Sequence, residues 1–551
     1  MTHAALDACL DTLANRKQTW ADTPVADRIA ILEAVKDNLL EVAPAWADTA
    51  ARAKGLDPAS PTAGEEWFAG PYAVMVWCNA MLHTLARVVD KRHLRGLPLR
   101  NLPGGRLAAR VVPNSIWDRV LFNGMTVDVW MQPGVDRDNL ITNSAASYDP
   151  TIPRIGKVAL VLGAGNVAAI APLDCLHKLF VENQVVLVKL NPVNDYLAEF
   201  LTAALAPLIT PGFLRIVAGD ATVGQYLCTH PLVETIHITG SGAAHDAIVW
   251  GPGADCVANK QAGKPKNPRP ISSELGGVSP TIVVPGPWSA TDLAYHAELV
   301  ASQKLNNDGF NCIACQVLVL SAVWPQRGDF LAALRAALAR STPRPLYYPG
   351  ATARLADFQR GLGAPLTASQ CQMSSFRAGD NPTAEQSEVF APALATTELP
   401  GGDPAAYLRA AITYANEKLA GTLGANILIH PKTMKQIGRG NFEALIAELR
   451  YGTIAINSWT GLGFGTPQAS WGAFPGHTLA DVQSGIGVVH NSYLFDRPER
   501  TVLEAPFRAP MRPPWFIFHR RAHILGRLMT RFQYRPSLAQ LPRIMLNAMR
   551  G

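Results

Sequence analysis

The stretch "KVALVLGAGNVAAIAPLDCLHKLFVENQVVLVKL", residues 157–190, decides the fold of this chain. It begins and ends with apolar runs, 157–163 and 184–190, and the segment between them has the length and texture of a helix. Strands without polar alternation are buried on both faces, as in a parallel sheet covered by helices. The pattern continues with a helical segment at 198–209 and apolar runs at 213–219 and 233–240, so we predict an α/β domain.

Other patterns flank this domain. Apolar residues recur at helical spacing in 26–54 and 73–89, with a proline- and glycine-containing break at 57–63. Short β-like runs follow between 107 and 147, and a second α/β region extends from 275 to about 465. A chain of 551 residues is too long for one ordinary core, so we expect two or three domains.

Composition indicates a globular protein of a reducing compartment. Hydrophobic residues make up 48% and charged residues 17%, and the eight cysteines are scattered with one close pair, unlike a secreted disulfide framework. The first residues lack the apolar core of a signal peptide, and no apolar run is long enough to cross a bilayer. We therefore expect a cytoplasmic protein.

The positive charge is concentrated in one segment. Ala505 to Gly551 contains nine arginines and no lysine, aspartate or glutamate, while the rest of the chain has 40 basic and 43 acidic residues. Aromatic and aliphatic residues alternate with these arginines at helical spacings. A helix packed on the body or on a neighbouring subunit and a peripheral membrane helix both fit this pattern. No nucleic-acid-binding module accompanies the charge, so no nucleic acid is expected.

The close cysteine pair lies in "NNDGFNCIACQ", residues 306–316. A zinc site needs four ligands, and no second Cys or His pair has usable spacing, so no metal is expected. A thioredoxin-like pair would begin a helix, whereas this one continues into the strand-like "QVLVLS". Two interpretations remain: a buried structural pair, or a nucleophile at Cys312 with Cys315 packed at the start of the strand.

Two more stretches contain candidate residues. "GAGNVAA", 163–169, partly matches the dinucleotide fingerprint G-x-G-x-x-G/A, but the next strand ends in Lys189 where an acidic residue would hold the ribose. A tight strand-to-helix turn explains it equally. In "ISSELGGVSPTIVV", 271–284, the single carboxylate Glu274 precedes two glycines, and on its own it would be a solvated loop charge.

Taken together, Asn166, Lys189, "ITGS" (238–241), "ELGG" (274–277), "GFNC" (309–312) and "EVFAP" (388–392) resemble, in order, the motifs of the aldehyde dehydrogenase superfamily. The resemblance implies a Rossmann-like cofactor domain, an α/β catalytic domain and a small β oligomerisation arm. It places the N-terminal helices and cofactor domain at 1–132 and 156–274, the arm at 133–155 and 476–496, the catalytic domain at 275–475, and a basic extension at 497–551.

The same resemblance implies three catalytic roles. The Cys312 thiolate would attack the aldehyde carbon, since thiolate is a strong nucleophile. The Asn166 amide and the backbone N–H of Cys312 would stabilise the resulting oxyanion, and losing one such donor typically costs about 3–4 kcal/mol of barrier. Glu274 would activate the water that hydrolyses the thioester, a role favoured when burial raises a carboxyl pKa.

By resemblance the cofactor is NAD or NADP, and seven residues are expected to bind it. Lys189 would contact the adenosine ribose, Ser241 the pyrophosphate and Glu388 the nicotinamide ribose, with Phe390 packed nearby. The others implied are Gly219, Gly240 and Leu275.

Three positions depart from the common motifs of the family. Pro192 stands where many NAD-using members have glutamate, which leaves NADP open. Gly-Ala-Gly precedes Asn166 in place of Pro-Trp, and Phe310 replaces a common glutamine. None of these removes a reacting group.

The expected reaction is oxidation of an apolar aldehyde to a carboxylic acid by a homodimer or homotetramer. Trp459, Phe464 and Phe474 lie in a stretch, 458–478, that resembles the substrate mouth, although aromatic residues there could equally be packing. A CoA-acylating dehydrogenase or acyl-CoA reductase is the enzymatic alternative, and Glu274 argues against it. A catalytically silent binding protein is the other.

Overall fold

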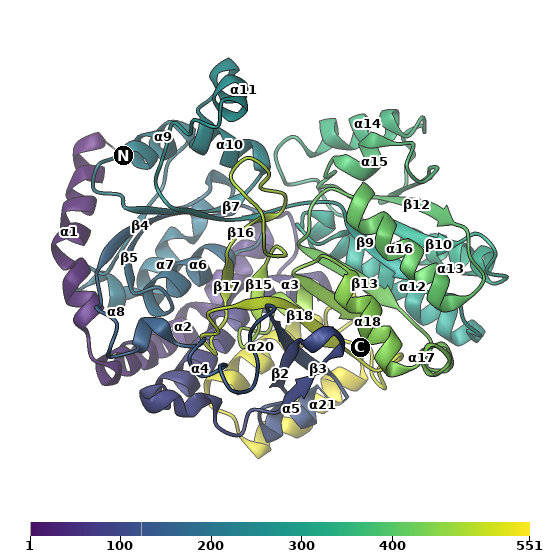
Figure 1. Cartoon of the computed structure of the whole chain (residues 1–551), viewed down its shortest axis with the longest axis horizontal. Helices are drawn as coiled ribbons and strands as arrows, with labels where there is room; N and C mark the ends of the chain where they lie inside the picture. Colours follow the sequence, from purple (N-terminus) through teal and green to yellow (C-terminus); the bar gives the residue numbers. More distant parts are fainter. Residues whose placement is uncertain (1, 123) are drawn as a thin grey trace.

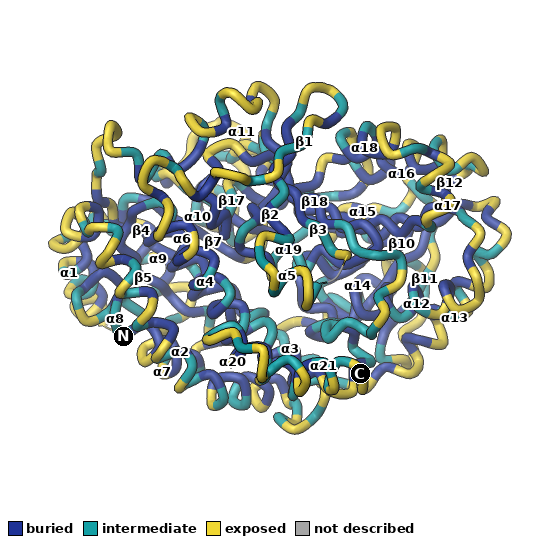
Figure 2. Tube along the Cα trace, turned by 90° about the horizontal axis from the view of Figure 1, so that it is seen from below, coloured by how far each residue is buried: buried dark blue, intermediate teal, exposed yellow. Residues whose placement is uncertain are grey.

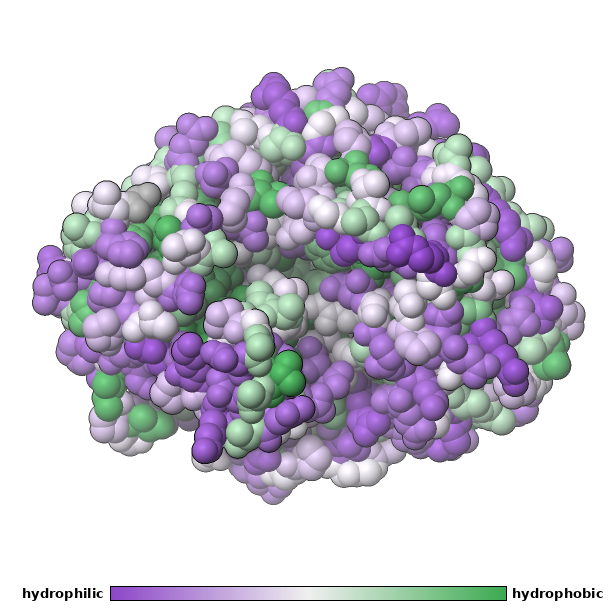
Figure 3. Space-filling view, turned by 90° about the horizontal axis from the view of Figure 1, so that it is seen from above, coloured by the Kyte–Doolittle hydropathy of each residue, from purple (hydrophilic) through white to green (hydrophobic). Residues whose placement is uncertain are grey.

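The structure, a computed structural model, describes residues 2–122 and 124–551. The chain forms two halves, each built on its own sheet, with the C-terminal helices lying between them at one side (Figure 1). Buried segments follow the two sheets and exposed segments follow the outer loops and helices (Figure 2). On the face opposite to that of Figure 2, the molecular surface is hollowed between the halves (Figure 3).

The first half contains a six-stranded sheet in the order β16-β8-β7-β4-β5-β6, parallel except for β16. Its strands are β4 (Lys157–Leu162), β5 (Gln184–Lys189), β6 (Leu214–Val217), β7 (Thr235–Gly240), β8 (Ile271–Leu275) and β16 (Gly485–Ile486). Its helices are α6 (Ile170–Phe180), η6 (Pro192–Leu197), α7 (Ala198–Ala204), α8 (Ala206–Ile209), α9 (Ala221–Thr229), α10 (Gly242–Trp250) and α11 (Ala254–Gln261). Every residue of β5 and α6 is buried, as the unbroken apolar runs predict.

The second half contains a ten-stranded sheet in the order β1-β2-β3-β18-β14-β13-β9-β10-β12-β11. Its strands are β1 (Leu99–Asn101), β2 (Leu107–Val112), β3 (Thr126–Met131), β9 (Ser279–Val283), β10 (Cys315–Ser321), β11 (Gln372–Ser375), β12 (Ala393–Leu399), β13 (Gly424–Leu428), β14 (Thr453–Ile456) and β18 (Pro498–Glu504). Strands β9 to β14 and β18 are parallel, while β1, β2 and β3 add to β18 in antiparallel order. The parallel part is covered by helices, and the antiparallel part extends it.

The helices of this half alternate with its parallel strands. They are α12 (Ala290–Leu305), η7 (Asn306–Gly309), α13 (Arg327–Ala339), α14 (Ala351–Gly361), α15 (Pro382–Gln386), α16 (Pro404–Lys418), α17 (Pro431–Ile437), α18 (Arg439–Glu448) and α19 (Gly461–Phe464). A small separate pair, β15 (Ser470–Gly472) and β17 (Val488–His490), is antiparallel. The short helical turns η4 (Pro103–Gly105) and η5 (Ala146–Tyr148) and helix α5 (Ile116–Leu121) lie in the segment before β4.

The N-terminal helices predicted from periodicity are present. They are α1 (His3–Asp22), α2 (Val25–Ala53), η1 (Pro61–Ala63), α3 (Gly64–Trp67), η2 (Phe68–Tyr72), α4 (Ala73–Leu85) and η3 (Val89–Leu94). Helix α1 packs on β4 and β5, and α2 packs on α7 and α4. The predicted helix at 198–209 is broken in two, because Pro207 has no N–H to continue the ladder and lies in the first turn of α8.

The basic C-terminal segment folds back onto the N-terminal helices. After an irregular stretch from Ala505 it forms α20 (Ala522–Tyr534), η8 (Leu538–Gln540) and α21 (Leu541–Met549). Helix α20 contacts α2, α3 and α4, which lie several hundred residues away in sequence (Figure 1). Among residues 2–122 and 124–551, no helix is both long and apolar enough to cross a membrane.

Domain boundaries in the structure differ from those expected. Strand β18 lies inside the large sheet between β3 and β14, so the extension begins after Glu504 rather than at 497. Strands β1–β3 join the same sheet, although they fall in the segment assigned to the cofactor half. In the expected arm, residues 133–155 form turns and one isolated bridge, from Ser144 to Phe495. Strand β16, from the second part of the expected arm, joins the six-stranded sheet. The assignment of an oligomerisation arm stays a prediction.

Candidate active site

The candidate nucleophile and base meet where the two sheets approach each other. Cys312 lies in the turn before β10, and Glu274 lies in β8 of the other sheet. The Sγ of Cys312 is 3.6 Å from Oε1 of Glu274. As an isolated pattern, Glu274 fitted a solvated loop charge, and that alternative is wrong: the residue is 3% exposed and pairs with Thr239 and Gly485 within the sheet.

The two cysteines of the close pair face different surroundings. Cys312 packs beside the cluster of Ile313, Trp459 and Trp471 at a cavity, whereas Cys315 is fully buried in the core formed by α12, β10 and α13. Both thiols are free. Within the described residues, no group of three or more His, Cys, Asp or Glu side chains is placed to hold a metal. The geometry therefore favours one accessible nucleophile and one packed neighbour.

Burial controls the protonation of this pair. Burial and, to a smaller extent, the nearby charge of Asp174 raise the pKa of Glu274 to about 8. Burial also raises the pKa of the Cys312 thiol well above its usual value, with the negative charges of Glu274 and Glu388 acting in the same direction. Both groups therefore hold their protons near pH 7, and Glu274 is the first of the two to lose its proton as the pH rises.

Asn166 lies beside the loop that holds Cys312. Its Nδ2 donates to the backbone oxygen of Phe310, two residues before the thiol, at 2.9 Å. An amide nitrogen has two hydrogens, so one remains for an oxygen on a substrate. The side chain is 6% exposed and lines the same cavity as Cys312 and Glu274. The structure thus brings the three predicted catalytic residues together.

A buried network braces this loop from behind. The Lys54 ammonium, at the end of α2, donates to Glu66 at 2.8 Å, to the Asn166 backbone oxygen at 3.1 Å and to Oδ1 of Asn307 at 2.9 Å. The Tyr347 hydroxyl lies 3.1 Å from the same two oxygens of Asn166 and Asn307. Lys54 and Glu66 are 6% and 2% exposed, so this ion pair is desolvated and fixed.

A second ion pair holds the loop backbone. Glu65 accepts two bonds of 2.7 Å from the Arg344 guanidinium, and its Oε2 also accepts the backbone N–H of Asn307 at 2.8 Å. Asn307, Asp308 and Gly309 have φ values of +51°, +52° and +79°, a run that side chains other than glycine rarely adopt. Such strained turns persist only where contacts with the surrounding structure hold their backbone in place, and the hydrogen bonds described above do so.

The two glycines of "ELGG" have a steric reason. A Cβ at Gly276 would collide with the carboxylate of Glu388, and one at Gly277 would lie 2.9 Å from the backbone oxygen of Ala420. Burial raises the pKa of Glu388 to about 8, although the Lys304 charge opposes the shift. The Oε1 atom of Glu388 finds no hydrogen-bond partner among the described residues. The glycines thus let a buried carboxylate approach the backbone beside Glu274.

The expected cofactor residues of the first half share one edge of its sheet. Lys189, Gly240 and Leu275 end β5, β7 and β8, and Gly219 follows β6. Ser241 caps the N-terminus of α10, where its hydroxyl accepts from the Ala244 N–H. The carboxyl ends of parallel strands are where α/β sheets bind ligands.

Two of these residues have informative surroundings. Lys189 is 8% exposed, and burial lowers the pKa of its ammonium, while the Asp220 charge partly opposes the shift. Phe390 has φ +41°, and its backbone oxygen accepts from Arg354 at 3.1 Å. Its ring lies 5.8 Å from that of Phe310, which is fully buried under this loop. Phe310 therefore packs beneath the loop as a core residue.

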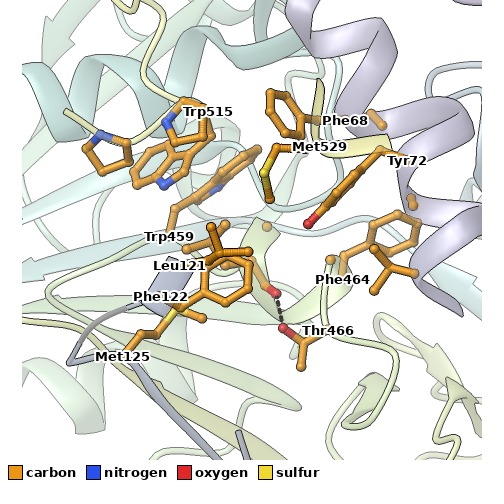
Figure 4. Close-up of a pocket in the computed structure, with 18 of the residues that line it drawn as sticks. Phe68, Tyr72, Leu121, Phe122, Met125, Trp459, Phe464, Thr466, Trp515 and Met529 are labelled. Carbon is orange, nitrogen blue, oxygen red and sulfur yellow. Dashed lines mark hydrogen bonds between the residues drawn. The ribbon is translucent and has the colours of Figure 1, made fainter. Parts of the chain in front are cut away.

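A cavity of about 890 Å³ opens from the thiol. Figure 4 shows Phe68, Tyr72 and Met529 grouped around it, with Leu121, Phe122 and Met125 below and Trp459, Trp515, Phe464 and Thr466 at its sides. Trp459 and Phe464 line it as predicted. Phe474 does not: its ring packs under the Arg500 guanidinium, 4.7 Å away, because the chain turns away from the cavity after β15.

Several residues of the site escaped the sequence analysis. Lys54, Glu65 and Glu66 belong to the N-terminal helices, where single charges resemble solvated ones. Their partners Tyr347 and Arg344 lie about 280 residues further on, in a stretch without a recognisable motif. The pattern "GEEW", which forms α3, was the only sequence signal for these residues, because it places two carboxylates in a short helix beside a buried tryptophan.

Comparison with solved structures identifies the fold. Aldehyde dehydrogenase C from Pseudomonas syringae, solved with NAD+ and octanal, superposes with a TM-score of 0.61 over 93% of this chain and 90% of that chain, at 15% identity. The aldehyde dehydrogenase KauB from Pseudomonas aeruginosa gives 0.58 over 91% and 88%, at 17% identity. This chain has the aldehyde dehydrogenase fold.

Sequence comparison agrees over a shorter range. Residues 168–344 match the family model described as "Aldehyde dehydrogenase family". Curated relatives include 4-trimethylaminobutyraldehyde dehydrogenase of Mus musculus, 39% identical over 17% of this chain, and betaine aldehyde dehydrogenase of Vibrio vulnificus, 30% identical over 23%. The chain spans only 16% and 20% of the length of these two relatives. The α/β fold class is confirmed, and the family resemblance predicted from the motifs is confirmed in sequence over residues 168–344.

Proposed function

We propose that the protein oxidises an apolar aldehyde to a carboxylic acid with NAD or NADP. The observation that carries this proposal is the meeting of Cys312, Glu274 and Asn166 at one apolar cavity, with Sγ of Cys312 3.6 Å from the carboxylate. A nucleophile, a base within reach and an amide beside the same loop are the parts that acyl chemistry on sulfur requires.

The first step forms a bond between sulfur and the aldehyde carbon. The thiol proton of Cys312 passes to solvent, the Sγ electron pair attacks the carbon, and the carbonyl π electrons move to oxygen. The free Nδ2 hydrogen of Asn166 and the backbone N–H of Cys312 donate to that oxygen. Because the Lys54 and Tyr347 contacts hold the Asn166 backbone, the donor is preorganised.

Residues at the sheet edge fit a dinucleotide. Ser241 offers the N-terminus of α10 to a phosphate, and Glu388 retains an oxygen without a partner among the described residues, suited to a ribose hydroxyl. Lys189, Gly219, Gly240 and Leu275 would line the same edge, with Phe390 beside Glu388. A dinucleotide held by these residues would supply the hydride acceptor for the carbon attached to sulfur, and Cys312 would then carry a thioester.

Hydrolysis then completes the reaction. Glu274 removes a proton from water as its oxygen attacks the acyl carbon, and the carbon–sulfur bond breaks with the electron pair returning to sulfur. The acid leaves and the thiolate is restored. Retention of this base supports acid release over transfer to CoA, the alternative for this fold.

The lining of the cavity supports an apolar substrate. The relatives named above act, by their names, on betaine aldehyde and 4-trimethylaminobutyraldehyde, which carry a quaternary ammonium group. Trp459 and Trp515, with ring centroids 5.4 Å apart, would suit such a cation as well as an alkyl chain. Substrate class is therefore part of the test.

The decisive measurement is NADH or NADPH formation with propanal, octanal, dodecanal and betaine aldehyde, each with and without CoA. Release of free octanoate without CoA supports the proposal, whereas octanoyl-CoA formed only with CoA supports the acylating alternative. No reduced cofactor with any aldehyde would leave the chain as a catalytically silent binding protein.

Assembly and location complete the proposal. By its fold the chain is proposed to act as a homodimer or homotetramer in the cytoplasm, with peripheral contact to anionic membranes through its basic C-terminal segment. Light scattering of the purified chain measures the oligomeric state, and sedimentation with anionic vesicles measures the membrane contact.

A further inference from the structure

Residues 505–551 supply one whole side of the cavity that opens at Cys312. The lining residues of this segment come from the irregular stretch and from both helices: most are apolar, among them Trp515, Leu525, Met529, Phe532 and Ile544, and Arg512, Gln533 and Tyr534 are polar. Figure 4 shows Met529 extending toward the cavity between Phe68 and Tyr72. A segment that looks like an appendage in the sequence is thus continuous with the active site.

Helix α20 is fixed against the N-terminal helices by close packing. Gly526 approaches so closely that a Cβ there would collide with the side chain of Trp67, and a Cβ at Gly64 would collide with Ala522. The Asn79 amide donates to the backbone oxygen of Gln533 at 2.7 Å. The helix is therefore part of the folded body and not a loosely attached tail.

The inner face of α20 is apolar and its outer face is charged. Leu525, Met529 and Phe532 are 2%, 7% and 1% exposed and pack with Phe68 and Tyr72. The Phe532 ring meets Trp117 edge-on, with centroids 5.3 Å apart. Arg527 and Arg531 of the same helix are exposed. Leu525, Met529 and Phe532 line the cavity, whereas Arg527 and Arg531 do not.

The irregular stretch before α20 is held by different contacts. Arg508 and Arg512 pair with Asp292 and Glu298 of α12 at 3.4 and 3.2 Å. The Trp515 backbone oxygen lies 3.4 Å from Nδ2 of Asn306, which begins the turn leading to Cys312. These contacts carry the Trp515 ring to the cavity beside Trp459.

We propose that residues 505–551 form the selectivity wall of the aldehyde site in their own chain, and that this site takes aldehydes with a long apolar chain contacting Met529. The inference rests on the proposed function and names its substrate class. A cavity of 890 Å³ lies near the upper end of small-molecule sites, far beyond what a short aldehyde fills.

Apolar contact at a distance from the thiol is the source of selectivity. Each buried methylene contributes about 0.8 kcal/mol, or roughly a fourfold gain in kcat/KM when the contact persists in the transition state. Methionine is flexible and unbranched, so Met529 adapts to an alkyl chain. The alkyl chain of a shorter aldehyde does not reach α20, so contact with this helix adds nothing to its binding free energy.

The test uses the full chain with two substitutions at one position. Met529→Trp fills the cavity and should lower kcat/KM for dodecanal by about tenfold or more while that for propanal stays within about twofold. Met529→Ala enlarges the cavity and should move the preferred aldehyde from dodecanal toward hexadecanal. Arg527→Ala, on the exposed face of the same helix, is the matched control and should leave the profile of chain lengths unchanged.

The outcomes separate this inference from the proposed function. If the unaltered chain reduces no cofactor with any aldehyde, the proposed function fails. If it oxidises aldehydes but kcat/KM is the same from propanal to dodecanal, the proposal of a selectivity wall is overturned. The same holds if Met529→Trp and Met529→Ala each change kcat/KM for short and long aldehydes by the same factor. A preference for betaine aldehyde over octanal also overturns it. Thermal melting of the C312A variant with dodecanal measures binding without turnover. Dodecanal should raise the Tm of the C312A variant, and it should not raise the Tm of C312A combined with Met529→Trp.

Discussion

The two sides of the Cys312 loop are built in opposite ways. On its polar side, Lys54, Glu66, Glu65 and Arg344 form desolvated ion pairs that hold the loop backbone through hydrogen bonds, and the first three of them also reach the cavity. In front of it, the cavity wall is mostly aromatic and aliphatic, and its contacts have no required direction. Under the proposed function, the ion pairs would determine how fast any aldehyde reacts, and the apolar wall would determine which aldehyde is bound.

The largest expected effect is at the loop itself. Cys312→Ala should abolish steady formation of reduced cofactor, since the sulfur forms the bond to substrate. Cys315→Ala should retain most of the activity, because its thiol packs in the core behind β10. Initial rates with octanal measure both. An inactive Cys315 variant beside an active Cys312 variant would reverse the assignment of the nucleophile.

Glu274→Gln tests the base next to the thiol. It should allow one burst of reduced cofactor and then stall as the thioester, because the amide cannot accept a proton from water. In the unaltered enzyme the steady rate should rise as pH passes about 8, since the buried carboxyl is protonated below that pKa. A steady rate in the glutamine variant equal to that of the unaltered enzyme would assign hydrolysis to another group.

The same carboxyl predicts a pH dependence of stability. Its pKa is raised above the unfolded value, so the folded state holds a proton that the unfolded state releases, and stability falls as pH rises from about 4.5 toward 8. Glu274→Gln removes this loss, and its Tm should exceed that of the unaltered chain more at pH 8 than at pH 5. Differential scanning calorimetry at the two pH values measures it, and an equal difference at both would contradict the shift.

Lys54→Met removes the buried ammonium that holds the Cys312 loop in place. It leaves Glu66 buried without its partner, which typically costs about 3–5 kcal/mol of stability. It also frees the Asn166 backbone, and small misplacements of that kind lower kcat by about a hundredfold. The decrease should be the same factor for propanal and dodecanal, unlike that of Met529→Trp. Pairing Lys54→Met with Glu66→Leu should recover stability but not kcat, which separates positioning from folding.

The smallest expected effect concerns the outer face of α20 and the chain beyond it. Arg527, Arg531 and Arg535 are exposed, and each cation near an anionic membrane contributes about 1 kcal/mol of attraction. Replacing all three by glutamine should reduce sedimentation with anionic vesicles and leave aldehyde oxidation unchanged. Equal sedimentation of the two proteins would remove the membrane prediction. Deleting 505–551 is a poor substitute, since it removes buried Phe516, Leu525 and Phe532 from the folded body.

Local pattern was sufficient for the first sheet and for the three proposed reacting groups, which the structure brings to one cavity. The apolar runs of β4, β5 and β7 match their predicted ranges, because burial on both faces requires an unbroken apolar run. Cys312, Glu274 and Asn166 were found because their motifs are short and contiguous. Glu274 was nevertheless compatible with a loop, since one residue does not show whether a strand has ended.

What could not be predicted depends on contacts between distant segments. Lys54 lies 112 residues before Asn166 and 253 before Asn307, and no spacing rule connects them. The position of β18 inside the large sheet also depends on pairing with β3 and β14. Phe474 was assigned to the cavity by its neighbours in sequence, but the chain turned it onto Arg500.

The contact of Gly64 with Ala522 and of Trp67 with Gly526 has a consequence for synthesis. A ribosome adds residues in order and early segments fold first, so the helices around Trp67 must keep an apolar surface exposed until residues 522–526 have been synthesised. During that interval the nascent chain is vulnerable to aggregation. We expect this protein to depend on chaperones more than its compact finished form suggests.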